Sequence, residues 1–340
     1  MAQVRSQLFL AIVWLAAGAV VCAAVVTGKG STSAEEALVL LILGLRGLLF
    51  DLRPDSTSFV IVWDLRLPRA LLAALLGAAL GVAGAITQGL FRNPMAEPGV
   101  LGVSSGAAAM AVLGFYLGFD QLSLWAIPAM AVLGSVSVLL LLLLLAARSS
   151  VTGLLLSGIA LGTFCSAMIT MVLAGQSSRW DLGIKVMTWL MGSFEGRTWS
   201  HLGAALPPCA VAFVLARWLR NDLDALHLGD ETAASLGVNL RRTRTLCIAT
   251  VGILVGTATA IPGVIAFIGL LVPHVARMVL GPGHKGLMHG SAALGALTLV
   301  TVDTLSRTIL PSAPPPGVIT SLLGAPLFLW LLQRKRPVQR

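Results

Sequence analysis

About ten long apolar runs, separated by short polar segments, divide the 340-residue sequence. A run of about 20 apolar residues crosses a bilayer once as an α-helix. Backbone amides in lipid must find partners inside the chain, and runs this long satisfy them as helices rather than as barrel strands. The sequence therefore predicts an all-α, polytopic membrane protein. The predicted spans lie near residues 7–27, 67–90, 100–118, 123–147, 152–174, 199–219, 244–262, 264–281, 288–306 and 317–333.

Charged residues are too few for a soluble protein, since they make up 11% of the chain against roughly 25% in soluble domains. The first run, Leu8 to Val26, is longer than the core of a signal peptide, and no A-x-A site follows it. We therefore expect it to remain as the first helix of a single transmembrane domain over residues 1–340. The four cysteines form no C-x-x-C pair, so we expect buried thiols and no metal site.

The distribution of basic residues predicts the orientation in the bilayer. A formal net charge of +9 is explained by cytoplasmic loops rich in Lys and Arg rather than by nucleic-acid binding, because positive charge gathers on the cytoplasmic side. An even number of spans then places both termini in the cytoplasm. The residues that agree with this assignment are Arg5, Arg148, Arg217, Arg220, Arg241, Arg242, Arg244, His284, Lys285 and the tail QRKRPVQR.

Three arginines, Arg66, Arg69 and Arg307, fall on the outer side and break this rule. One interpretation is local: Arg66 and Arg69 reach outer headgroups or pair with Asp64, and Arg307 pairs with Asp303 four residues earlier on one helix face. The other interpretation is a basic collar that receives an acidic partner. The residues alone leave both open.

Two polar segments on the cytoplasmic side interrupt the apolar pattern. In RNPMAEPG (92–99), prolines break the helix, which makes either a structural turn or a gate at the mouth of a pathway. In the loop of about 220–243, Asp230 and Glu231 open a short helix that Gly237 ends. That helix is either a solvated connector or a docking element for another protein.

Motifs for covalent chemistry and for energy coupling are absent from the sequence. It has no P-loop, no H-E-x-x-H and no G-x-S-x-G. Acidic residues are scarce within the spans, whereas a proton- or sodium-coupled carrier normally needs an ionisable residue inside the membrane. We therefore expect a translocating subunit rather than an enzyme, with its energy source on a separate chain. A secondary carrier or channel that works without an ATPase is the alternative.

Several stretches resemble one known family. They are RLPRALLAALLGAALGVAGAITQGLFRNPMAEPGVLGVSSGAA, LLLSGIALG, LHLGDETAASLGV, GVIAFIGLLVPHVARMVLGPGHK, VDTLSRT and PPGVITSLLGAPLFLWLL, which together run from residue 66 to the C-terminus. The chain is similar to FecCD-type permeases of ABC importers for iron chelates and vitamin B12. The resemblance implies the type II ABC importer permease fold with ten helices per subunit.

The resemblance also implies the partners and the place of work. These are a homodimer in the bacterial inner membrane, two ABC ATPase subunits that carry the ATP and magnesium, and one periplasmic binding protein. No cofactor is expected on this chain. The expected cargo is an iron chelate, either a ferric siderophore or haem, or cobalamin, moved from periplasm to cytoplasm.

Residue roles follow from the matching motifs. The resemblance implies that Arg66, Arg69 and Arg307 dock the binding protein. It implies that Gly229, Asp230, Glu231 and Gly237 contact the ATPase as a coupling helix. The cytoplasmic gate maps to Asn93 and Met95 and, in a second part, to Val151 and Thr152, where Val151 replaces a hydroxyl residue of the family.

Overall fold

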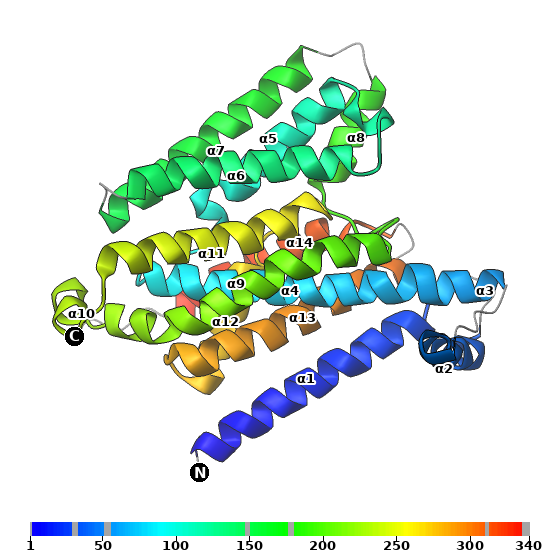
Figure 1. Cartoon of the computed structure of the whole chain (residues 1–340), viewed down its shortest axis with the longest axis horizontal. Helices are drawn as coiled ribbons and strands as arrows, with labels where there is room; N and C mark the ends of the chain where they lie inside the picture. The colour runs from blue at the N-terminus through cyan, green and yellow to red at the C-terminus, as the bar shows by residue number, and fades with distance from the viewer. Residues whose placement is uncertain are drawn as a thin grey trace.

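The computed structural model describes residues 2–28, 33–50, 56–146, 150–175, 180–309 and 313–334. Arg148 and the end of the basic tail lie outside these residues. The described part is built from helices, and none of it forms a strand (Figure 1). The α-helices are α1 (Ala2–Val26), α2 (Ala34–Phe50), α3 (Thr57–Phe59), α4 (Leu67–Leu90), α5 (Val103–Tyr116), α6 (Ala126–Ala146), α7 (Val151–Ala174), α8 (Trp180–Leu190), α9 (Trp199–Leu226), α10 (Asp230–Ser235), α11 (Leu240–Ala260), α12 (Ile268–Leu280), α13 (His284–Thr308) and α14 (Pro316–Arg334).

The helices confirm the predicted all-α membrane architecture. Within the described residues, six helical segments are long and apolar enough to cross a membrane: Ser6–Val26, Thr57–Leu90, Ala126–Leu145, Val151–Ala174, Trp199–Leu226 and Leu240–Ala260. Three shorter apolar segments, Val103–Tyr116, Ile268–Leu280 and Pro316–Trp330, and the 25-residue α13 match the remaining predicted spans. About ten spans are therefore consistent with the structure.

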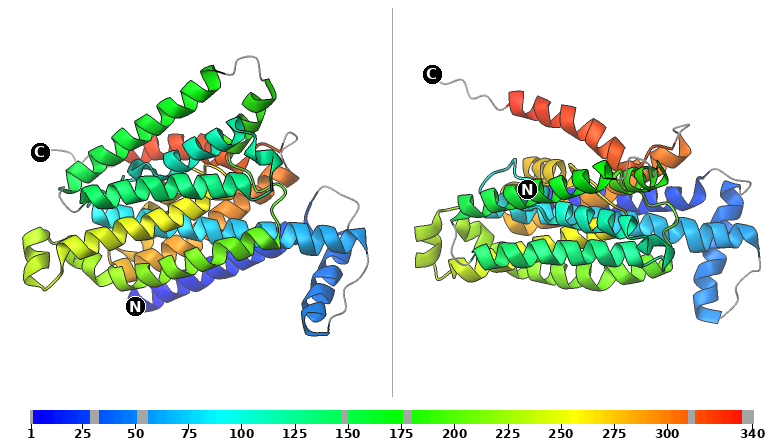
Figure 2. Two further views of the ribbon diagram at one scale, coloured as in Figure 1. Left: turned by 45° about the horizontal axis from the view of Figure 1, so that its top comes forward. Right: turned by 90° about the horizontal axis from the view of Figure 1, so that it is seen from above.

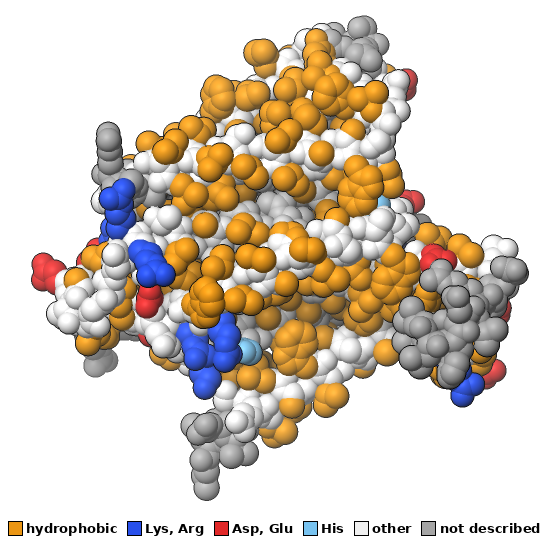
Figure 3. Space-filling model, viewed as in Figure 1, with side chains coloured by type: hydrophobic (Ala, Val, Ile, Leu, Met, Phe, Trp, Pro, Cys, Tyr) orange, Lys and Arg blue, Asp and Glu red, His pale blue; other side chains and the backbone are white. Residues whose placement is uncertain are grey.

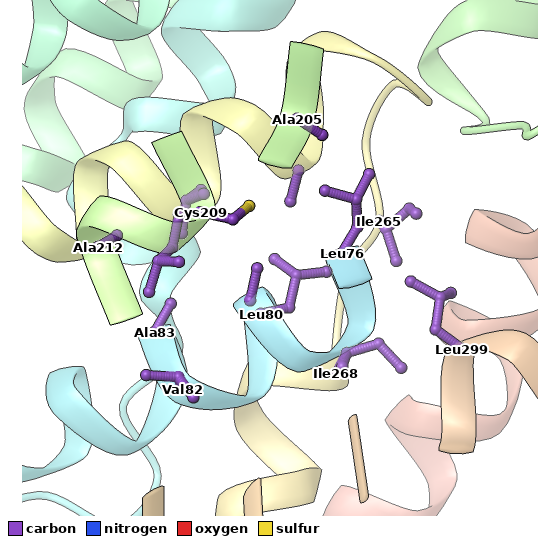
Figure 4. Packing of buried hydrophobic residues seen from close by; sticks show 14 of the residues in the cluster. Leu76, Leu80, Val82, Ala83, Ala205, Cys209, Ala212, Ile265, Ile268 and Leu299 are labelled. Atoms are coloured by element: carbon purple, nitrogen blue, oxygen red, sulfur yellow. The ribbon is translucent and has the colours of Figure 1, made fainter. Parts of the chain in front are cut away.

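Helix α4 is the centre of the bundle, with 83% of its apolar segment buried. It packs against α13 so closely that a Cβ on Gly77 would lie 2.2 Å from the carbonyl oxygen of Gly295, and a Cβ on Gly295 would meet Gly77 in the same way. Small residues allow membrane helices this approach. Figure 4 shows Leu76, Leu80 and Ala83 of α4 among side chains from α9, α13 and the segment before α12.

Some helix ends differ from the predicted ones. Helix α9 continues to Leu226, beyond the predicted end near 219, because no Gly or Pro interrupts the chain between Pro208 and Gly229. Helices α5 and α12 have 14 and 13 residues, which gives each about 20 Å, less than the ~30 Å hydrocarbon core. Each follows an irregular segment, 91–102 and 261–267, that replaces the start of the predicted span.

The bundle has two ends that matter for function. At one end α3, a π-helical turn over Val60–Arg66 and α4 form a continuous rod, and α2 lies beside it. We call this the α2 end. At the other end, α10 projects beyond the bundle; we call it the α10 end. Figures 1 and 2 place the beginning of α1 and the far end of α14 toward the α10 end.

Candidate docking and coupling sites

Arg69 at the α2 end forms a forked ion pair with a buried carboxylate. Its Nε and Nη2 donate to the two carboxylate oxygens of Asp303, at 2.9 and 2.7 Å. Asp303 is 1% exposed, and the close packing of α4 on α13 brings the two residues together. A bidentate, charge-assisted pair of this kind fixes position as well as charge. Arg307 approaches the same carboxylate, with its Nε 3.8 Å from Oδ2.

Arg66 and Arg307 also hold the end of α1. Arg66 Nη1 donates to the carbonyl oxygens of Val25 and Val26, at 3.2 and 3.5 Å. Arg307 Nη1 donates to Thr27 O at 3.0 Å, and its Nη2 donates to Ala24 O. The last carbonyls of a helix have no partner inside it and carry partial negative charge. The two guanidinium groups therefore cap α1 from neighbouring helices.

The structure brings all three predicted docking arginines together. Arg66, Arg69 and Arg307 line one polar cavity of about 360 Å³, with Ser193, Glu195 and Ser306 among its other walls. The local pairing of Arg307 with Asp303 is present, but Arg66 donates to the backbone of α1, a partner that the sequence did not indicate. Docking of another protein at these arginines stays a prediction.

The predicted coupling helix exists as α10, a six-residue helix between two glycines. Gly229 has φ 111° and Gly237 has φ 87°, conformations that side chains with a Cβ rarely adopt. Ala233 of this helix is fully buried. Most other side chains of this segment are exposed, among them the acidic Glu231 and the apolar Leu236 directly after the helix.

Asp230 links α10 to two other elements. One carboxylate oxygen pairs with Arg92, in the turn that follows α4, and the other accepts from Arg244 Nη2 of α11 at 2.6 Å. Arg92 itself has a left-handed backbone, with φ 48°. The three side chains lie at the surface of the α10 end, where 36–40% of the Arg92 and Asp230 side chains is exposed. Movement of α10 would therefore pull directly on the turn after α4.

That turn carries the first predicted gate residues. Asn93 Oδ1 accepts from the backbone N–H of Met95 at 2.9 Å, which closes a local turn. Glu97 accepts from the backbone N–H of Phe267 at 2.9 Å, at the start of α12. Burial raises the pKa of the Glu97 carboxyl, and the Phe267 hydrogen bond opposes that rise. The turn is thus tied to α10 on one side and to α12 on the other.

Val151 and Thr152, the second predicted gate part, are the first two residues of α7. The Ser150 side chain caps the helix by accepting from the Gly153 N–H at 3.1 Å. Figure 1 shows this end of α7 at the α10 end of the molecule. The gate assignment of these two residues stays a prediction.

Sequence reasoning missed Arg92 and Arg244 as partners of Asp230, and Asp303 as the partner of Arg69. Asp303 lies 234 positions from Arg69, and only the packing of α4 on α13 reveals that contact. Arg92 offered a usable signal, because it is a charged residue beside a helix-breaking proline at the cytoplasmic edge of a predicted span.

Comparison with known proteins decides the family. A model of the FecCD transport family matches residues 7–334. The chain belongs to the FecCD transport family. It is 42% identical over 291 residues to the vitamin B12 import system permease protein BtuC of Yersinia enterocolitica, with 84% of this chain and 85% of that protein covered. It is also 42% identical over 289 residues to the hemin transport system permease protein HmuU of Yersinia pestis, covering 81% and 84%.

A solved structure agrees with this assignment. A protein described as a metal-chelate type ABC transporter in an inward-facing conformation has a TM-score of 0.83 and 30% identity, with 96% of this chain and 98% of that chain covered. The family resemblance and the ABC importer permease fold are therefore confirmed, and this FecCD protein is a multi-pass membrane transport protein. Nothing in the comparisons supports a secondary carrier or channel.

Proposed function

We propose that this FecCD protein is the transmembrane permease subunit of an ATP-driven importer in the bacterial inner membrane. Its cargo is an iron chelate (a ferric siderophore or haem) or cobalamin, delivered by a periplasmic binding protein. The observation that carries the proposal is 42% identity to two import permeases over more than four fifths of the chain. A separate pair of ATPase subunits supplies the energy, and both termini of this chain lie in the cytoplasm.

Coupling to the ATPase is assigned to α10. Gly229, Asp230, Glu231 and Gly237 form or flank this short helix at the surface of the bundle, and its exposed Leu236 offers an apolar contact. A push on α10 reaches Asn93 and Met95 through the ion pair between Asp230 and Arg92. This path supports a gate that responds to ATP use on another chain.

The pathway is assigned to the interface of a homodimer. Only 11% of the apolar segment of α7 is buried within the chain. One face of α7 carries exposed hydroxyl residues at successive intervals of eleven, three and four positions, close to whole turns of a helix, which places them in a stripe. The stripe consists of Thr152, Thr163, Ser166 and Thr170. The hydroxyl groups of Thr163, Ser166 and Thr170 donate to backbone carbonyl oxygens one turn earlier. A second copy with a water-filled path beside this stripe would supply donors for their remaining lone pairs.

Reconstitution of the full transporter tests the proposal. The tagged chain is purified from its own cells with the proteins that accompany it, placed in vesicles, and offered labelled cobalamin, haemin and a ferric siderophore. We expect an ABC ATPase to co-purify and one of the cargoes to accumulate only when ATP is inside the compartment that the ATPase faces. Uptake by the chain alone, without nucleotide, would establish a secondary carrier instead.

A variant separates the role of α10 from general loss of structure. Joint substitution of Asp230, Glu231 and Gly237 by Ala is expected to abolish co-purification of the ATPase. Substitution of Arg241 and Arg242 by Gln, in the same region but outside α10, is the control and is expected to leave it intact. An ATPase that stays bound to the triple variant would remove the coupling assignment.

A further inference from the structure

A second cavity lies between α1, α4, α9 and α13, away from the docking and coupling sites. Its volume is about 420 Å³. Its walls are apolar and come from all four helices, including Trp14, Ala78, Phe213, Met288 and Ala292. All four helices are membrane spans, so the cavity opens at the depth of lipid tails rather than of water.

Basic side chains gather at one end of this cavity. Arg217 and Arg220 of α9 and Lys285 and His289 of α13 belong to its lining. Figure 3 shows Lys and Arg side chains and a histidine together on the face where α1 diverges from the bundle. These residues lie toward the α10 end, which is where the headgroups of one leaflet reach.

The positive charges of this group lack an ion-pair partner in the part of the chain that the structure describes. Among the ion pairs of the described residues, none involves Arg217, Arg220 or Lys285. The carboxylates that follow on α9 have other partners. Asp222 accepts from the Thr243 hydroxyl at 2.7 Å, and Asp224 accepts from Nδ1 of His284, itself part of the cavity lining, at 2.6 Å. By contrast, Arg69, Arg92 and Arg244 each have an acidic partner. This group of basic residues is therefore a candidate binding site for an anion.

We propose that this cavity binds an anionic phospholipid, with its phosphate against Arg217, Arg220 and Lys285 and one acyl chain along the apolar wall. Basic pockets between membrane helices at the cytoplasmic face suit such headgroups. A free phosphate would use the cations but leave the apolar part of the cavity unfilled. The cargo pathway lies elsewhere, because Figure 1 places α1 and α7 on opposite sides of the bundle.

Lipid titration followed by native mass spectrometry tests the proposal on the full chain in detergent. The probes are phosphatidylglycerol, phosphatidylcholine with the same acyl chains, and inorganic phosphate. We expect phosphatidylglycerol to bind one copy per chain, well ahead of phosphatidylcholine. The R217Q/R220Q variant should bind phosphatidylglycerol about 30-fold more weakly, since each basic residue near a headgroup contributes roughly fivefold.

Two further variants distinguish a lipid site from a general attraction of charge. R241Q/R242Q removes the same charge beside another cavity and should change binding less than about twofold by the same reasoning. Ala292→Phe fills the apolar wall without changing charge and should weaken lipid binding. Equal losses in both arginine pairs, unchanged binding in Ala292→Phe, or inorganic phosphate that displaces the lipid would overturn the proposal. Thermal melting of each variant verifies that it is folded.

Discussion

At the scale of single residues, the stability of the α2 end depends on the negative charge of Asp303. It is almost fully buried and faces two arginines, Arg69 in a fork and Arg307 at a longer distance. Removing one partner of a buried ion pair costs more than the pair itself contributes, because the remaining charge is left without compensation. Asp303 thus connects α4, through Arg69, with Arg307, which caps the end of α1.

Asp303→Asn should therefore destabilise the protein by about 3 kcal/mol, measured as a lower melting temperature in detergent. Asp64→Asn is the matched control, since Asp64 lies at the same end of the molecule and takes part in none of the ion pairs among the described residues. Equal shifts in the two variants would show that Asp303 acts only through its contribution to net charge.

The Arg92–Asp230 pair makes a second prediction at this scale. Arg92→Gln should reduce ATP-driven uptake at least about fivefold, the lower range of coupling between distant sites, while the ATPase remains bound. Its effect on stability should stay below about 1 kcal/mol, because the pair is partly exposed. Uptake assays in vesicles and melting in detergent give the two readouts.

A charge exchange tests whether the two side chains act together. The double variant R92D/D230R should recover part of the uptake that R92D or D230R alone loses. All three carry Arg244→Gln as well, so that the new arginine does not face a second cation. Arg241→Gln, an exposed charge outside this pair, should transport normally. If the double variant were no better than either single one, the pair would not be the path from α10 to the gate turn.

At the scale of helices, the contact of α4 with α13 depends on residues that have no side chain. A Cβ on Gly77 would lie 2.2 Å from a backbone oxygen, whereas a Cβ on Gly203 of α9 would meet nothing within 4 Å. Gly77→Ala should therefore destabilise the protein by about 2 kcal/mol or more through overpacking. Gly203→Ala should stabilise it by about 0.5–1 kcal/mol by reducing the freedom of the unfolded helix.

Melting temperatures of these two single-methyl variants provide the check. A loss in Gly77→Ala together with no loss in Gly203→Ala would support backbone contact between α4 and α13. Similar small gains in both would mean that α4 and α13 are further apart than the structure places them.

Most helices could be predicted from the sequence, because a long apolar run in lipid satisfies its backbone hydrogen bonds by forming a helix. Helix α8 was not predicted, since Trp180–Leu190 is short and alternates apolar with polar residues. Helices α5 and α12 are shorter than their apolar runs, because irregular segments ending at Gly102 and Phe267, both with positive φ, take up the difference. The apolar pattern indicates which segments lie in the membrane. The irregular segments that connect them depend on distant contacts such as the hydrogen bond between Glu97 and Phe267.

The candidate site was predictable in its residues and in the local pair of Arg307 with Asp303, but not in its other connections. Arg66, Arg69 and Arg307 stood out because they oppose the charge rule, and the structure places them around one cavity. Their partners, Asp303 and the carbonyls at the end of α1, are more than 230 and about 40 or 280 positions away in sequence. No periodicity in the chain encodes contacts at such separations.

At the scale of the whole molecule, burial is uneven. Helix α4 is enclosed on nearly all sides, whereas α7 turns most of its length outward. The proposed homodimer covers this surface of α7, including its hydroxyl stripe, with a second copy. The described chain is therefore half of a pathway in the proposed homodimer.

Disulfide cross-linking tests whether α7 lies at the interface of the proposed homodimer. Thr163→Cys in a Cys22→Ser background should give a covalent dimer on mild oxidation, because Cys22 is the exposed native cysteine and the other three are buried. Leu15→Cys, which is 74% exposed on α1, should stay monomeric under the same conditions. A dimer through Leu15→Cys and none through Thr163→Cys would place the interface on the opposite side.

In the proposed importer, the fork between Arg69 and Asp303 would also limit how long the binding protein stays docked. A carboxylate of the binding protein would replace one ion pair of Arg69 by another, so docking would gain only the difference between two similar attractions. Brief visits suit a binding protein that must leave empty and return loaded, and in this proposal a buried acid of the permease sets the residence time of its partner.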